Sequence, residues 1–224
     1  MNSHFSRALL LPLILIASSS LWAQQMTQTL PAVQDAWAQQ PITTPPAVRD
    51  PDEYAVWSVV LTNKYVTGSV KELVIADRTI ILKSDFVAKH LRSFENATDT
   101  VSDLLDKNQV QYAVENKFAV NVPCTIWSKE TANALFHLPA NHGLDPEAVK
   151  NMNDGWHQFH KEHPDTGGGG IIGMSRVGFN ADKTQAVVYI ATSASPMIAN
   201  GKCFLLTKKN GSWEIEREDL IWFS

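Results

Sequence analysis

The pattern in this sequence that comes closest to a reactive site is a triplet of histidines at a spacing of three residues. His157, His160 and His163 lie in a segment with helical periodicity, and two imidazoles so spaced on one helix can reach the same metal ion. On a helical wheel, His160 and His163 fall on the same side as Trp156, whereas His157 points about 100° away. We therefore expect the polar edge of a packed helix, and we retain His160 and His163 as candidates for ligand binding.

A mononuclear metal site needs at least one further ligand. His142 and Asp154 are nearby residues of a suitable type, but no spacing rule brings either one to the histidine pair. We therefore predict no metal. The sequence also lacks a dinucleotide-binding fingerprint, a zinc-protease helix and paired cysteine clusters, so we predict no cofactor.

Arg176 is the remaining candidate for ligand binding. In a strand over Ile171–Phe179, the period of two places Arg176 on one face with Ile172 and Met174. A guanidinium on an apolar face needs a carboxylate or a ligand as partner, so we expect a structural ion pair, with an anion site as the alternative. Neighbouring Ser175 lacks the Gly-x-Ser-x-Gly turn of a hydrolase nucleophile, and we expect it to be a packing residue with a satisfied hydroxyl. We predict no catalytic residue.

Four consecutive glycines, Gly167–Gly170, separate a predicted helix from a predicted strand. Phosphate-binding loops have the opposite order, strand then glycines then helix, so that the helix N-terminus meets the anion. We therefore interpret this run as a connector.

The first 23 residues predict export. A weakly basic start with Arg7 precedes an apolar run of about ten residues, and small residues lead to Ala23, as in a secretory signal peptide. The run is shorter than the roughly 20 residues that span a bilayer, so we expect cleavage after Ala23 and no stable membrane insertion afterwards. We predict a periplasmic or extracellular location. The net charge of −4 argues against nucleic acid as a partner, which leaves an unidentified protein or small ligand.

Two cysteines, Cys124 and Cys203, follow the signal peptide. In an oxidising compartment a lone pair of cysteines usually forms a disulfide, and we predict that bridge here. The alternative is two separate buried thiols that act as small apolar side chains.

The remaining chain is organised as a leader and one domain. Residues 24–50 are rich in Gln, Thr and Pro and predict a flexible leader, and residues 51–224 predict a single α+β domain. Asp50 as N-cap and Pro51 at the first turn predict a helix that ends near Gly68. Further helices are expected over 98–107, from Ser128 onward and over 146–164, with a break in the last one near residues 153–155.

One or two strands are expected over 72–76 and 79–82, another over 118–127, and then four over 171–179, 184–191, 202–208 and 212–217. Asn210-Gly211 is a strong hairpin signal between the last two. We therefore predict an α+β fold in which helices pack on a C-terminal antiparallel meander.

Four stretches, residues 156–164, 175–180, 185–189 and 210–213, resemble a group of uncharacterised bacterial exported proteins. The resemblance implies export and a compact α+β domain, and it brings no activity, cofactor or catalytic residue with it. The chain is more loosely similar to nuclear-transport-factor-2-like domains, which also pack helices onto a curved antiparallel sheet and end in a strand with Gly-x-Trp. Enzymes and non-enzymes are both common in that fold class.

Two functions follow as hypotheses. The first is an exported, non-catalytic binding or scaffold domain, favoured because no pair of titratable residues has a spacing that predicts catalysis. The alternative is a small secreted hydrolase or isomerase, in which His160 or His163 meets an aspartate or glutamate only in the folded protein.

Overall fold

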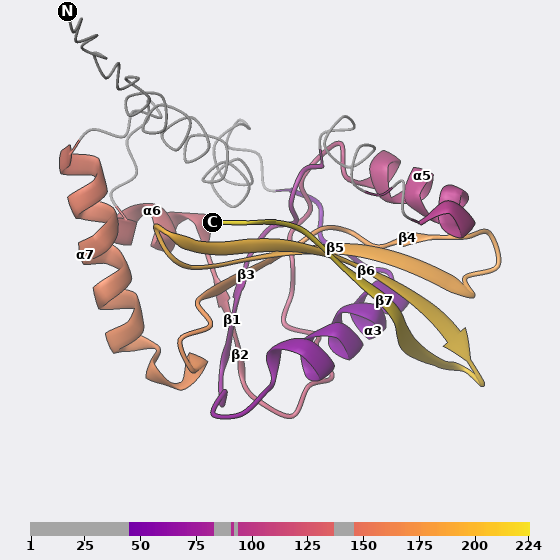
Figure 1. Cartoon of the computed structure of the whole chain (residues 1–224), viewed down its shortest axis with the longest axis horizontal. Helices are drawn as coiled ribbons and strands as arrows, with labels where there is room; N and C mark the ends of the chain where they lie inside the picture. The colour runs from indigo at the N-terminus through magenta and orange to yellow at the C-terminus, as the bar shows by residue number, and fades with distance from the viewer. Residues whose placement is uncertain (1–44, 83–90, 92–93, 137–145) are drawn as a thin grey trace, which may run out of the picture.

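A computed structural model describes residues 45–82, 91, 94–136 and 146–224 (Figure 1). The predicted signal peptide and most of the predicted leader lie outside the described residues. The described part is an α+β fold with one mixed sheet of seven strands, in the order β2-β1-β3-β5-β6-β7, with β4 paired to β5. The predicted fold class is confirmed.

The helices lie close to the predicted ranges. They are α3 (Pro51–Val60), continued by a π-helical turn over Leu61–Tyr65, α5 (Thr98–Lys107), α6 (Lys129–Phe136) and α7 (Pro146–Glu162), with 3-10 turns at Glu95–Ala97 and Pro164–Thr166. The first start signal is confirmed, because the Asp50 carboxylate accepts a hydrogen bond from the amide of Asp52 at 3.0 Å. Packing begins slightly before the helix, since Val48 is only 1% exposed.

The strands are β1 (Leu73–Ala76), β2 (Cys124–Trp127), β3 (Ile171–Met174), β4 (Gly178–Phe179), β5 (Gln185–Ser195), β6 (Ile198–Lys209) and β7 (Ser212–Phe223). β5, β6 and β7 form the predicted antiparallel meander. Asn210 and Gly211 have φ values of 51° and 83°, which is the backbone of the predicted hairpin turn.

Two expected strands are shorter than predicted, and the second of the two segments near residue 80 forms none. The segment 171–179 is interrupted at residues 175–177, only the last four residues of 118–127 pair, and residues 79–82 form no strand. β1 pairs in parallel with both β2 and β3, so the sheet is mixed rather than a pure meander. Parallel pairing joins segments far apart in the chain, and local residue patterns do not encode it.

Helices cover both faces of the sheet (Figure 1). On one face, Tyr54, Trp57 and Val60 of α3 belong to a core cluster with Phe204 and Leu206 of β6. On the other face a second cluster joins α5, α6 and α7 to the sheet through Leu104, Phe136, Trp156, Phe159 and Tyr189. The predicted packing of helices on the meander is therefore confirmed, with the sheet as the middle layer.

Helix α7 continues without a break through Gly155, where the sequence suggested an interruption. The reason is contact with α6, since a Cβ atom on Gly155 would lie 2.6 Å from Cδ1 of Phe136 and 2.8 Å from the carbonyl oxygen of Leu135. Glycine at this position permits close approach of the two helices.

The predicted disulfide between Cys124 and Cys203 is wrong, because both thiols are free. Cys124 lies on β2 and Cys203 on β6, with β1, β3 and β5 between them. Four steps of about 4.8 Å separate the two strands by about 19 Å, far beyond the Cα separation of about 7 Å that a disulfide can bridge. The two cysteines also belong to the core clusters on opposite faces of the sheet. The alternative of two separate thiols holds.

None of the described helices has the length and apolar character needed to cross a membrane.

Candidate functional site

Helix α7 carries His157 and His160, and His163 directly follows its last residue. His157 is exposed, whereas His160 and His163 are partly buried beside the aromatic residues of the core. His160 and His163 do not share a hydrogen-bond partner, since the first contacts the carbonyl oxygen of Ala194 and the second contacts Glu72.

The contact of His163 with Glu72 joins the end of α7 to the start of β1. Nδ1 of His163 lies 3.3 Å from each carboxylate oxygen of Glu72. The hydroxyl of Thr125, on β2, donates to Oε1 of the same carboxylate at 2.6 Å. The side chains of His163 and Glu72 are 15% and 19% exposed. Because a carboxylate can only accept, Nδ1 of His163 is the donor in this contact.

Two aromatic rings fix the orientation of the His163 ring. Trp127 meets it edge-on at 88° with ring centroids 6.1 Å apart, and Phe159 lies at 5.0 Å and 36°. This arrangement supplies a histidine and an orienting carboxylate, two parts of a general acid–base centre. The Thr125 hydroxyl donates to Glu72, and the Thr166 hydroxyl donates to the carbonyl oxygen of His163 at 2.9 Å.

His160 is held by a different contact. Its Nε2 lies 2.8 Å from the carbonyl oxygen of Ala194, and because a carbonyl can only accept, Nε2 carries the proton. Its ring lies 5.8 Å from that of Trp156. Both candidate histidines therefore tie α7 to the sheet.

Among the described residues, no group of three or more His, Cys, Asp and Glu side chains is placed to hold a metal ion. Asp154 is exposed on α7, and His142 lies outside the described residues.

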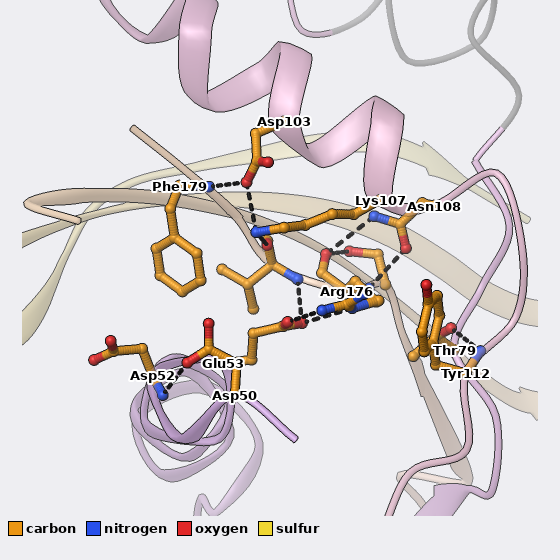
Figure 2. Close-up of polar contacts among 12 residues, drawn as sticks. Asp50, Asp52, Glu53, Thr79, Asp103, Lys107, Asn108, Tyr112, Arg176 and Phe179 are labelled. Carbon is orange, nitrogen blue, oxygen red and sulfur yellow. Dashed lines mark hydrogen bonds and ion pairs between the residues drawn. The ribbon is translucent and has the colours of Figure 1, made fainter. Parts of the chain in front are cut away.

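Arg176 lies away from the histidines, in the irregular segment between β3 and β4, and pairs with Glu53 of α3 (Figure 2). Glu53 is fully buried. Its carboxylate accepts from Nε of Arg176 at 3.3 Å, from Nη2 of the same side chain, and from the amide of Val177 at 3.0 Å. Arg176 thus has the carboxylate partner that the sequence predicts for a guanidinium on an apolar face.

Other contacts of Arg176 complete this network. Its guanidinium carbon lies 4.2 Å from the centre of the Tyr112 ring, and its amide donates to Oδ1 of Asn108 at 2.7 Å. Burial lowers the pKa of Arg176, but hydrogen bonding and charge attraction from Glu53 outweigh burial and raise that pKa above its ordinary value. The network joins α3, the end of α5 and the irregular segment, and its geometry is that of a structural ion pair.

Ser175 is the satisfied packing residue that the sequence predicts. It is fully buried. Its hydroxyl donates to the carbonyl oxygen of Arg176 at 2.8 Å and accepts from the amide of Tyr189 at 3.0 Å.

The glycine run connects the 3-10 turn at Pro164–Thr166 to β3. Gly167, Gly168 and Gly170 have positive φ values. A Cβ atom on Gly170 would lie 2.0 Å from the carbonyl oxygen of Ser193, so this position needs glycine for close backbone approach. The connector interpretation accounts for the run.

Sequence reasoning missed an apolar surface where β7 ends. Met197, Ile198, Leu220 and Phe223 are 65%, 62%, 54% and 74% exposed, and we call these four residues the apolar corner. Register brings them together, because Phe223 pairs with Asn200 and Leu220 with Lys202, just after the β5–β6 turn. The sequence feature that could have indicated this surface is the uncharged run Leu220–Ser224, which follows a densely charged stretch.

The chain was compared with protein-family models, curated proteins and solved structures, and none of the three comparisons gave a match.

Proposed function

We propose that this protein is an exported binding or scaffold domain without catalytic activity, and that its working surface is the apolar corner. The observation that carries the proposal is the gathering of four exposed large apolar side chains at one end of the sheet. Single exposed apolar residues are ordinary, but contiguous ones mark contact surfaces.

The position of the apolar corner supports a protein partner. It includes the end of β7, and among the described residues β7 pairs only with β6. An unpaired strand edge presents free amides and carbonyls that can bind another extended segment. Apolar side chains beside such an edge add area that association removes from water.

Export is supported by the signal-peptide pattern of the first 23 residues. N-terminal sequencing of protein recovered from outside the cytoplasm should begin at Gln24. Recovery of the protein from the cytoplasm with Met1 retained would contradict the proposed location.

Partner binding is tested by comparing proteins that co-purify with the wild type and with Phe223→Lys after mild cross-linking in exporting cells. Val149→Lys is the matched control, because Val149 is 39% exposed on α7. We expect a co-purifying species that Phe223→Lys loses and Val149→Lys retains. Equal recovery from all three proteins would show that the apolar corner is not the working surface.

A hydrolase or isomerase is the second candidate function, and the contact of His163 with Glu72 is the observation that favours it. A base oriented by a carboxylate is a recurrent part of such enzymes. The described contacts add neither a nucleophile nor an oxyanion-stabilising group beside this pair. We therefore place this function second.

The second candidate is tested by assaying hydrolysis of a panel of chromogenic esters and amides by the wild type, His163→Gln and Glu72→Gln. An enzyme centred on His163 would lose its turnover in His163→Gln while the fold survives, and Glu72→Gln would change its pH profile. Activity that is absent, or equal in all three proteins, removes this candidate for those substrates.

A further inference from the structure

We infer that β7 pairs through its last residues with the same segment of a second copy of this chain, antiparallel and across a two-fold axis. This inference rests on the proposed function and names the partner of the apolar corner. A two-fold interface requires a self-complementary surface, and charge and side-chain direction along β7 provide one.

Charge selects the part of β7 that can pair with itself. Glu214, Glu216, Glu218 and Asp219 surround the single positive residue Arg217. Pairing centred on this stretch would place carboxylates of the two copies opposite one another, which is unfavourable. Pairing centred between Ile221 and Trp222 instead places residues 214–218 of each copy beyond the shared segment 219–224.

Side-chain direction agrees with this register. Directly opposite residues of an antiparallel pair point to the same face. Leu220 would lie opposite Phe223 of the second copy. Within one chain, Leu220 and Phe223 pair with Lys202 and Asn200 of β6, which point to the face that α3 covers, so both apolar side chains point to that face. Ile221 would lie opposite Trp222 of the second copy. A register shift between Gly201 and Lys202 leaves Ile221 as an extra residue on β7, so Ile221 and Trp222 both pack against the core cluster on the other face. A register shifted by one residue would lose this agreement.

The rest of the apolar corner extends the contact. Ile198 lies two positions before Asn200 on β6, so it continues the Leu220 and Phe223 face beside the strand end. Residues 195–201 and 220–224 contain no charged side chain, and Asp219, which would lie opposite Ser224 of the second copy, is the one charged side chain of the shared segment. The shared segment is about six residues long, so the interface is small and the dimer is expected to be weak.

Sedimentation equilibrium of the chain that begins at Gln24, from about 10 µM to about 1 mM, tests the inference in the range expected for a small interface. We expect a concentration-dependent dimer. Leu220→Lys and Phe223→Glu each place a charge opposite an apolar residue and should weaken dimerisation at least tenfold. Val149→Lys should leave dimerisation unchanged. Equal melting midpoints for all variants would establish that the fold is intact.

An equimolar mixture of Leu220→Lys and Phe223→Glu tests the register itself. In the mixed dimer, Lys at position 220 of one copy faces Glu at position 223 of the other, and the second pair is the native Leu220 and Phe223. We expect the mixture to recover dimerisation that neither variant shows alone. A wild type that stays monomeric over the whole range, or a mixture that fails to recover, would overturn the inference.

A monomer whose apolar corner still cross-links to another protein would leave the proposed function standing, whereas a monomer without such a partner would remove both.

Discussion

At the residue scale, the ion pair of Arg176 with Glu53 is the clearest case in which a sequence argument found its physical answer. The sequence indicates that Arg176 needs a carboxylate, but it cannot say which of the 23 acidic residues supplies it. Glu53 lies 123 positions away in the chain, at the first turn of a helix where the sequence suggested only a favourable dipole contact. Only the folded chain identifies the partner.

Removing the Glu53 charge should destabilise the domain strongly. Glu53→Gln leaves the Arg176 guanidinium without its counter-charge in a buried site, and the expected loss is about 3 to 5 kcal/mol of unfolding free energy, measured by urea denaturation. Glu214→Gln is the matched control, because Glu214 pairs with Lys209 at 3.1 Å and is 55% exposed; its effect should stay within about 0.5 kcal/mol. A loss below about 1 kcal/mol in Glu53→Gln would contradict the structural role of the pair.

The cysteines provide a pH-dependent test. Unreduced protein alkylated in denaturant should carry two adducts. In the native protein, burial raises the pKa of the Cys124 thiol to about 11, so the reactive thiolate is scarce below that pH. The alkylation rate of Cys124 should therefore keep rising about tenfold per pH unit from about pH 8 to about pH 10. A rate that levels off near pH 9, or an unreduced protein without free thiols, would contradict this account.

At the element scale, local chemistry predicted helices and hairpins better than sheet order. Capping by Asp50 and the Asn210-Gly211 turn depend on neighbouring residues, and both were predictable. The parallel pairing of β1 with β2 and β3 depends on contacts across 50 to 100 residues, and no local pattern indicates it. The disulfide failed for the same reason, because cysteine count carries no information about the strands that separate Cys124 from Cys203.

At Gly155, local helix propensity and tertiary packing favour different residues. In an isolated helix, replacement of glycine by alanine is favourable by about 1 kcal/mol. In this fold the added Cβ would collide with Phe136 and Leu135 of α6, so Gly155→Ala should destabilise the domain by about 1 to 3 kcal/mol. Thermal unfolding measures the sign, with Asn153→Ala as the control on the exposed side of α7. If both substitutions raise the melting midpoint, the contact of α6 with α7 is not as close as described.

At the scale of the whole molecule, the candidate ligand residues and the apolar corner have different roles. His160 and His163 contact a backbone carbonyl and a carboxylate of the sheet side, and Arg176 contacts a carboxylate of α3. Each contact joins two separate elements of the fold. The apolar corner has exposed side chains beside an edge strand and no comparable structural task. The sequence directed attention to the histidines because their spacing is conspicuous. It did not predict the corner, because exposure depends on which strand ends at the edge of the sheet.

The most direct test of a working surface at the apolar corner is site-specific photo-cross-linking in cells that export the protein. A photoreactive amino acid replaces Phe223 in one variant and Val149 in the other, and adducts are identified by mass spectrometry. The account predicts a discrete adduct from position 223, formed with a second copy of this chain or with another exported protein, and none from position 149. No adduct at position 223, or the same adducts from both positions, would contradict it.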